Sequence, residues 1–264
     1  MLDLKSISKT FNAGTVNEKT ALNNLCLHLN DGDFVTVIGG NGAGKSTMLN
    51  AVAGAWPVDE GTIEIGGVNV TKLPEYKRAK YLGRVFQDPM TGTAASMQIE
   101  ENMALAARRG LSRTLKKGIS SKEREFYRER LVELGLGLED RMTSKVGLLS
   151  GGQRQALTLL MATLKKPQLL LLDEHTAALD PKTAAKVLEA TDRIVGQDNL
   201  TTLMITHNMK DAIAHGNRLV MMYEGHIIYD VAGEEKKKLH VSDLLEKFEQ
   251  VSGGSFANDR MILS

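Results

Sequence analysis

The stretch FVTVIGGNGAGKST, Phe34 to Thr47, decides the fold that this sequence predicts. It opens with FVTVI, a run that is typical of a strand buried within a sheet. GGNGAGKS follows and matches the pattern G-x-x-x-x-G-K-[S/T], and a helical stretch runs from Lys45 toward Ala53. A strand, this loop and a helix, in that order, are the context in which the pattern binds the phosphates of a nucleotide.

The residue types of the loop suit a polyanion. Glycines let backbone N–H groups turn inward, and the start of the helix adds further free donors. Lys45 supplies a positive charge for the β- and γ-phosphates, and the hydroxyl of Ser46 is a ligand for Mg²⁺. The alternative is a glycine-rich turn before a helix, which the surrounding elements disfavour. The predicted nucleotide-binding residues of the loop are Gly39, Asn41, Gly42, Ala43, Gly44, Lys45, Ser46 and Thr47.

A second stretch, LLLLDEHTAALD from Leu169 to Asp180, ends an apolar strand on two carboxylates. Adjacent carboxylates in such a place are costly unless a cation compensates their charge. We therefore expect Asp173 to anchor a Mg²⁺ that bridges the phosphates. Glu174 is expected to point elsewhere along an extended chain and to act as the general base for the attacking water. An ordinary pair of acids at a strand end is the alternative.

The motif LSGGQ, Leu149 to Gln153, precedes a long helix with an apolar face. Serine is a favourable N-cap, and two glycines allow backbone N–H groups to meet an anion. The chain thus carries two anion-binding helix starts but only one carboxylate placed for magnesium.

These residues resemble the ATP-binding cassette (ABC) transporter family, importer type, over nearly the whole chain. GGNGAGKS is similar to the Walker A loop of that family, VFQDP to its Q-loop and LSGGQ to its signature. LLLLDE is similar to its Walker B strand, AALD to its D-loop and ITHN to its switch histidine. The six motifs also occur in the family's order.

The resemblance implies an ATPase that uses ATP and Mg²⁺ and forms a head-to-tail dimer, most simply a homodimer. Each ATP would lie between the Walker A loop of one chain and the signature of the other. The roles implied are Gln87 at Mg²⁺ and the attacking water, His207 at the γ-phosphate, Asp180 across the dimer interface, Phe11 on the adenine, and Ser150, Gly151, Gly152 and Gln153 at the partner's nucleotide. Alone, His207 would be read as a polar strand-end residue and Phe11 as a core aromatic.

The expected fold class is α/β, a P-loop NTPase core. It has a mixed, mostly parallel sheet with helices on both faces, an N-terminal antiparallel β subdomain and an inserted helical subdomain. The core with its β subdomain is predicted over residues 1–88 and 150–264, and the helical subdomain over 89–149, with Phe126, Leu131 and Leu134 on one helical face. GTIEIGGVNV predicts a hairpin about Gly66 and Gly67, and VSGGSF, Val251 to Phe256, a C-terminal turn.

The family resemblance also implies partners. The chain would power import through an integral membrane permease, served indirectly by an extracytoplasmic substrate-binding protein, from a peripheral position on the cytoplasmic face of the membrane. A short permease helix is expected in an apolar cleft near Gln87 and Met97. The branch most resembled includes cassettes labelled tryptophan or tyrosine importers, which suggests amino-acid transport. An exporter subunit, a soluble ABC ATPase not tied to transport and a regulatory module without turnover are the alternatives.

The composition adds exclusions. The net charge of +1 over 264 residues gives no general attraction to nucleic acid. No window approaches the roughly 18 apolar residues of a membrane span. The single cysteine, Cys26, cannot form an intrachain disulfide and is expected to be packed in a strand. The run EEKKK, Glu234 to Lys238, is expected to be a solvated turn. One departure from the family is His175, which stands where proline is usual and would add a titratable ring near Glu174.

Overall fold

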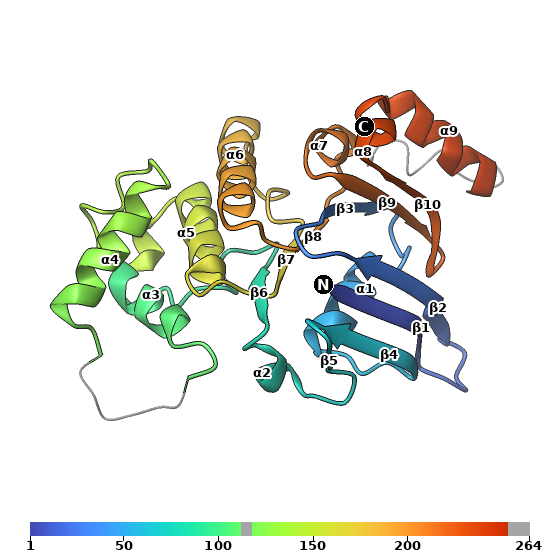
Figure 1. Ribbon diagram of the computed structural model, residues 1–264, viewed down its shortest axis with the longest axis horizontal. Helices are drawn as coiled ribbons and strands as arrows, with labels where there is room; N and C mark the ends of the chain where they lie inside the picture. Colours follow the sequence, from blue (N-terminus) through green and yellow to red (C-terminus); the bar gives the residue numbers. More distant parts are fainter. Residues whose placement is uncertain (112–117, 253–264) are drawn as a thin grey trace.

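The computed structural model describes residues 1–111 and 118–252. Two sheets form its centre (Figure 1). The larger sheet has six strands in the order β10-β9-β3-β8-β7-β6, and the smaller has four in the order β2-β1-β4-β5. Every neighbouring pair from β9 to β6 is parallel, whereas β10 and the whole smaller sheet are antiparallel. The predicted α/β class, with a mixed sheet and an antiparallel N-terminal sheet, is confirmed.

The strands are β1 (Leu2–Phe11), β2 (Lys19–Leu29), β3 (Phe34–Gly39), β4 (Glu60–Ile65), β5 (Val68–Asn69), β6 (Leu82–Val85), β7 (Leu169–Asp173), β8 (Thr202–Ile205), β9 (Arg218–Tyr223) and β10 (His226–Ala232). The helices are α1 (Lys45–Ala53), α2 (Glu75–Arg78), α3 (Ile99–Ala107), α4 (Ser121–Val132), the 3₁₀ turn η1 (Val146–Leu148), α5 (Gly151–Thr163), α6 (Pro181–Asp198), α7 (Met209–Ala214), α8 (Gly233–Lys237) and α9 (Val241–Ser252). No helix in the described residues is both long and apolar enough to cross a membrane.

The four leucines of β7 serve both faces of the large sheet. Leu169 and Leu171 pack into the core that contains α1 and the antiparallel sheet, while Leu170 and Leu172 pack into the core beneath α5 and α6. All four are fully buried. Side chains alternate along a strand, so a strand covered on both faces needs apolar residues at every position. The strand ends at Asp173, the first of its residues that is only partly buried.

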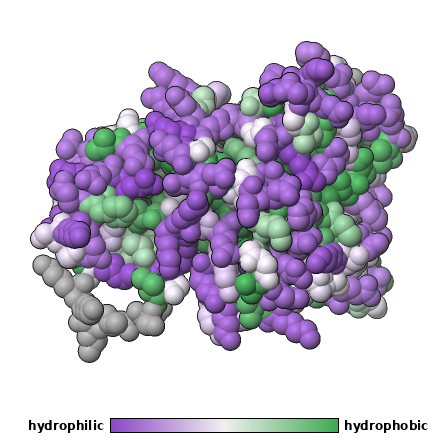
Figure 2. All heavy atoms as spheres, viewed as in Figure 1, coloured by the Kyte–Doolittle hydropathy of each residue, from purple (hydrophilic) through white to green (hydrophobic). Residues whose placement is uncertain are grey.

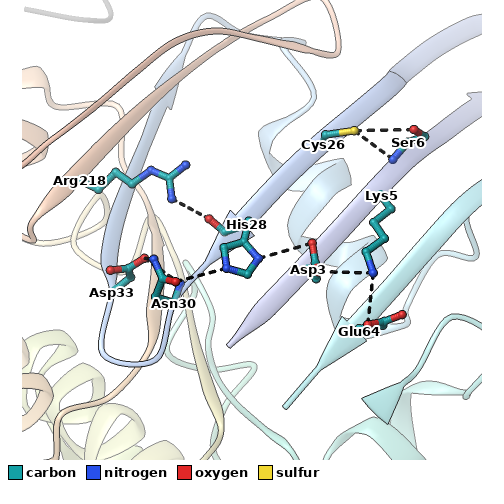
Figure 3. Close-up of polar contacts among 9 residues, drawn as sticks. All are labelled: Asp3, Lys5, Ser6, Cys26, His28, Asn30, Asp33, Glu64 and Arg218. Carbon is teal, nitrogen blue, oxygen red and sulfur yellow. Dashed lines mark hydrogen bonds and ion pairs between the residues drawn. The ribbon is translucent and has the colours of Figure 1, made fainter. Parts of the chain in front are cut away.

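The antiparallel sheet buries only one face. Its outward residues form a strip of polar contacts in which Lys5 lies 3.5 Å from both Asp3 and Glu64 and His28 lies 3.6 Å from Asp3 (Figure 3). The Arg218 guanidinium on β9 donates to the His28 carbonyl at 2.6 Å and so ties the two sheets together. Cys26 lies on the same outward face, so its predicted packing is wrong. In LCLHL the leucines point inward, and a period of two sends Cys26 outward with His28.

The segment after Pro89 is less helical than predicted. Residues 89–97 form mainly turns and bends, and the helices in the described part of this block are α3, α4 and the short η1 (Figure 1). Leu131 and Leu134 are buried, but Phe126 is exposed, so the three do not share one buried face. The hairpin about Gly66 and Gly67 is confirmed. Most of VSGGSF lies outside the described residues.

The run EEKKK is helical instead of a turn and is solvated except at one residue. Glu234 to Lys237 belong to α8, and Lys236 is 2% exposed whereas the other four residues of the run are exposed. The ammonium of Lys236 donates to the carbonyls of His215 and Gly216, and burial lowers its pKa to about 8. The charge pattern EEKKK indicates exposure, but the position of α8 against α7 and β9 brings one lysine inward. Elsewhere the surface in view is largely hydrophilic, with small separate hydrophobic patches (Figure 2).

Candidate active site

The phosphate loop lies at the carboxyl end of β3, and α1 begins directly after it. Gly39 has φ of +152°, and a Cβ there would lie 2.3 Å from the carbonyl oxygen of Met222. A Cβ on Gly44 would lie 2.4 Å from the carbonyl oxygen of Ala21. A side chain at either position would push the loop away from β9 or β2. Neighbouring backbone therefore requires these glycines, in addition to the room that an anion needs.

Lys45 is held against its own loop. Its ammonium donates to the carbonyl of Gly39 at 2.6 Å and to that of Gly40 at 3.1 Å. The residue is 5% exposed. A buried ammonium needs hydrogen-bond acceptors, and the loop carbonyls supply them. The charge thus lies within the loop that the sequence assigns to phosphate.

One cavity of about 290 Å³ brings most of the predicted residues together. Its lining includes Asn41–Thr47 of the loop and α1, with Phe11, Glu174 and His207. Phe11 packs edge-on against Trp56, with ring centroids 5.1 Å apart. Lys19 also lines the cavity and was not predicted. It pairs with Phe11 in the β1–β2 register, a signal that only the strand pairing reveals.

Glu174 and His207 are in direct contact. The Nε2 atom of His207 lies 2.6 Å from Oε1 of Glu174, and both side chains are largely buried. Glu174 has φ of +47°, and its N–H donates to the carbonyl of Ile205 at 3.0 Å. The sequence-based reason for separating Glu174 from Asp173, an extended chain, is therefore wrong. A left-handed turn at Glu174 directs its carboxylate toward the end of β8.

Asp173 has a counter-charge that the sequence analysis missed. Nη2 of Arg84, on β6, lies 3.4 Å from Oδ2 of Asp173 and donates to Oδ1 of Asn50 at 2.8 Å. Burial raises the pKa of Asp173, and the charge of Arg84 opposes that shift. An arginine inside the strand-forming run LGRVF is the signal that could have found this contact.

The residues predicted to hold Mg²⁺ fit a hard cation. Ser46 offers a hydroxyl oxygen, Gln87 an amide oxygen and Asp173 a carboxylate whose burial calls for a positive neighbour. Among the described residues no group of three His, Cys, Asp or Glu side chains could hold a metal alone. A single carboxylate suits Mg²⁺ that shares its ligands with nucleotide phosphates. Gln87 is exposed and does not line the 290 Å³ cavity.

The signature residues lie apart from the phosphate loop. Ser150 and Gln153 line a different cavity, of about 300 Å³, with Gly152. They also cap α5 reciprocally. The Ser150 hydroxyl accepts from the N–H of Gln153 at 3.3 Å, and the Gln153 side chain accepts from the N–H of Ser150 at 3.2 Å. No signature residue lines the cavity that holds the phosphate loop.

Close packing explains one signature glycine. A Cβ on Gly152 would lie 1.9 Å from Cγ2 of Thr183, so glycine lets the start of α5 lie against α6. Asp180 caps α6, and its carboxylate accepts from the N–H of Thr183 at 3.1 Å. Hydrogen bonds from Thr183 lower the pKa of Asp180. The signature and the D-loop stretch are therefore joined through the first turn of α6.

An apolar groove of about 230 Å³ lies on another surface. Phe86, Ala106 and Met161 line it, together with Arg84 and Arg109. Phe86 immediately precedes Gln87, as the predicted cleft requires. Neither Gln87 nor Met97 lines this groove, so the predicted lining was wrong in both residues, and Phe86, Ala106 and Met161 line it instead.

Comparison with known proteins agrees with this geometry. Residues 22–177 match the family model described as ABC transporter. The chain belongs to the ABC transporter family. It is 46% identical over 250 residues to the "Tyrosine transport ATP-binding protein" of Clostridioides difficile (strain R20291), covering 94% of this chain and 99% of that relative. It is 36% identical over 231 residues to the methionine import ATP-binding protein MetN of Bartonella henselae, covering 86% of this chain and 64% of the relative.

Solved ABC cassettes share the fold. The dimeric cassette MJ0796, bound to ADP and Pi in a post-hydrolysis state, matches with a TM-score of 0.74 and 28% identity over 88% of this chain and 98% of that one. The ADP conformation of the cassette MJ1267 matches with a TM-score of 0.77 and 26% identity over 94% of this chain and 98% of that one. The predictions of an ATP-binding ABC ATPase and of transport through a separate permease are confirmed.

In this ABC ATPase the unusual His175 does not face the nucleotide cavity. It is 2% exposed, and its Nε2 lies 3.1 Å from the hydroxyl of Thr191. That hydroxyl donates to the carbonyl of Val187, so its oxygen is left to accept a hydrogen bond from Nε2–H of His175. Burial, aided by the charge of His215, lowers the pKa of His175 to about 4. The expected titratable ring is therefore present but uncharged near neutral pH.

His175 should make stability depend on pH. In the unfolded chain a histidine takes up its proton near pH 6.5, whereas in the folded chain it does so near pH 4. Above pH 6.5 the ring is neutral in both the folded and the unfolded chain, so burying it costs no deprotonation. As the pH falls from 6.5 toward 4 only the unfolded chain gains the proton, and the free energy of unfolding drops by up to about 3 kcal/mol. Urea unfolding at pH 7.5 and 4.5 should show a smaller loss for His175→Gln than for the wild type. The matched control His226→Gln removes an exposed histidine, and an equal effect from it would contradict the assignment.

Proposed function

We propose that this ABC ATPase hydrolyses Mg²⁺-bound ATP with Glu174 as the general base and His207 as its positioning partner. The observation that carries the proposal is the single cavity lined by the phosphate loop, Glu174 and His207, in which Glu174 and His207 touch at 2.6 Å. A carboxylate held by one imidazole can accept a proton from a water aimed at the γ-phosphate. The same imidazole can then donate to a phosphate oxygen.

The other residues bind and orient the nucleotide. Phe11 stacks on the adenine, and the loop N–H groups and Lys45 hold the phosphates. Ser46, Gln87 and Asp173 hold Mg²⁺, which when bound neutralises developing charge on the phosphates. The ammonium of Lys45 leaves the carbonyls of Gly39 and Gly40 for phosphate oxygens. Residues 89–149 act as the helical subdomain, and 1–88 with 150–264 as the nucleotide-binding core.

Glu174→Gln should separate binding from turnover. Glutamine is close in size to glutamate but is not a base, so ATP binding should persist while the hydrolysis rate falls by about 10²–10⁴. Lys45→Ala should instead weaken nucleotide binding itself. Phosphate release and a fluorescent-nucleotide titration measure the two effects. Undiminished hydrolysis by the folded Glu174→Gln chain would falsify the base assignment.

We further propose that hydrolysis needs two chains arranged head to tail. The support is that Ser150, Gly152 and Gln153 line a cavity of their own, away from their own phosphate loop. In a head-to-tail pair each signature would complete the partner's site, and Asp180 would lie at the interface. Backbone N–H groups at the start of α5 would then meet the γ-phosphate.

Mixing two inactive variants tests this arrangement. Ser150→Arg should place a bulky side chain against the partner's nucleotide, and Lys45→Ala should disable the chain's own loop. A mixed dimer would contain one intact composite site and one doubly altered site, so the mixture should regain part of the activity. Phosphate release from each variant alone and from the mixture is the measurement. Activity that stays at the level of the separate variants would contradict the two-chain model.

For cargo, we propose an aromatic amino acid such as tyrosine. Its support is the 46% identity to a tyrosine transport ATP-binding protein over nearly the full length of both chains. Import would proceed through a permease served by an extracytoplasmic binding protein, with this chain on the cytoplasmic face of the membrane. A short permease helix would dock in the groove at Phe86, Ala106 and Met161.

Two neighbouring substitutions on α3 test the docking site. Ala106 lines the groove, whereas Leu105 is 58% exposed and does not line it. Ala106→Glu should abolish co-purification with the permease and tyrosine uptake into vesicles while leaving the ATPase rate of the isolated chain unchanged. Leu105→Glu should preserve all three. Assembly of the Ala106→Glu chain, or vesicles that take up methionine but no tyrosine, would refute the docking site or the cargo respectively.

A further inference from the structure

Arg84 contacts both elements that the proposed magnesium site uses. It projects from β6 beside β7, and its side chain is 14% exposed. One nitrogen, Nη2, lies 3.4 Å from Oδ2 of Asp173 and 2.8 Å from Oδ1 of Asn50. Asn50 lies on α1, one turn after Ser46, and its side-chain amide donates to the Ser46 carbonyl at 2.8 Å. One guanidinium is thus joined to Asp173 directly and to the Ser46 turn through Asn50.

The position of this guanidinium is also fixed from the other side. It stacks on the ring of Phe86 at 4.5 Å, and both side chains line the 230 Å³ groove. A stacked, hydrogen-bonded arginine loses little further freedom by pairing with a carboxylate. The contact between Arg84 and Asp173 is therefore held in place by neighbouring groups. The Arg84 side chain reaches from that carboxylate to the groove.

We propose that Arg84 is a resident counter-cation of Asp173 and that it competes with Mg²⁺ for this carboxylate. The inference rests on the proposed function in taking Asp173 as the metal carboxylate. A largely buried carboxylate is stabilised in its charged form by a neighbouring cation. Arg84 is such a neighbour of Asp173. When Mg²⁺ arrives, two cations share one carboxylate, and their repulsion weakens metal binding.

This competition has a consequence for coupling. Because Arg84 also lines the groove, a helix seated there contacts the same side chain that holds Asp173. Drawing the guanidinium away from Asp173 and farther into the groove would release the carboxylate to the metal. The groove and the metal site are then linked by a single residue, in addition to the Q-loop stretch at Gln87.

Magnesium titration of nucleotide binding tests the proposal without turnover. The melting temperature is followed at fixed ADP while Mg²⁺ rises from an EDTA baseline. Arg84→Met should melt lower than the wild type without nucleotide, because Asp173 loses its counter-charge. In this variant the Mg²⁺ concentration that gives half of the rise in melting temperature (the half-point) should fall about three- to tenfold. That is the size expected for one partly buried ion pair. Arg84→Gln should behave likewise and serves if Arg84→Met does not fold.

Arg109→Met is the matched control. Arg109 lines the same groove, but its guanidinium donates to the carbonyls of Ala162 and Lys165 instead of to Asp173. Its half-point in Mg²⁺ should equal that of the wild type. An unchanged or raised half-point in the Arg84 variants would overturn the proposal, and so would an equal fall in Arg109→Met.

Asp173→Asn separates the inference from the function on which it rests. If Asp173 holds the metal, this variant should lose the Mg²⁺ dependence of ADP stabilisation. Arg84→Met should lower the melting temperature of the wild type but not that of the Asp173→Asn variant. In that variant no carboxylate charge remains for Arg84 to pair with. A retained Mg²⁺ dependence in Asp173→Asn would overturn the metal site itself. If Asp173→Asn loses the Mg²⁺ dependence but the Arg84 variants keep the wild-type half-point, only the inference is overturned.

Discussion

The site depends on the close packing of the phosphate loop against two other stretches of backbone. Gly39 lies against the Met222 carbonyl at the end of β9, and Gly44 lies against the Ala21 carbonyl in β2. The turn between β9 and β10 forms hydrogen bonds with both the phosphate loop and β2. The N–H of Gly225 donates to the carbonyl of Ala43 in the loop, and the carbonyl of Gly225 accepts from the N–H of Asn23 in β2. These contacts join the antiparallel sheet to the parallel one at the loop. Phe11 and the loop line one cavity.

Around this loop each buried charge has a local partner. Lys45 donates to loop carbonyls, Asp173 meets Arg84, and Glu174 meets His207. Buried charges without such partners would destabilise the fold. In the proposed function Lys45 would exchange the loop carbonyls for phosphate oxygens and Asp173 would be shared between Arg84 and Mg²⁺, whereas His207 would stay on Glu174. The protein thus stabilises the buried charges around this loop with its own groups.

Four residues predicted to contact the partner chain also have structural roles within this one. Ser150 and Gln153 cap α5, and Asp180 caps α6, while Gly152 lets the two helix starts approach each other. Capping fixes the backbone N–H groups that an anion would meet. The same residues therefore stabilise the helix ends. The signature motif contributes to folding as well as to the proposed binding of the partner chain's nucleotide.

The sequence by itself determined the fold class and the family. Strand, phosphate loop and helix are local features, and six motifs in order carry enough residue-by-residue information to be read without contacts. It also predicted Lys45, Asp173, Glu174 and His207 as site residues, because each lies in such a motif. It misjudged Cys26, Lys236 and the lining of the groove, where exposure depends on which neighbouring element covers a residue.

Only the tertiary structure decided how those charges are balanced. Arg84 and Asp173 are distant in the sequence and meet because β6 and β7 are neighbours in the sheet. Lys19 faces the nucleotide cavity because its strand pairs with the end of β1, and His175 becomes neutral because α6 covers it. Pairing and burial are properties of elements brought together from far along the chain, and a local pattern of residues does not contain them.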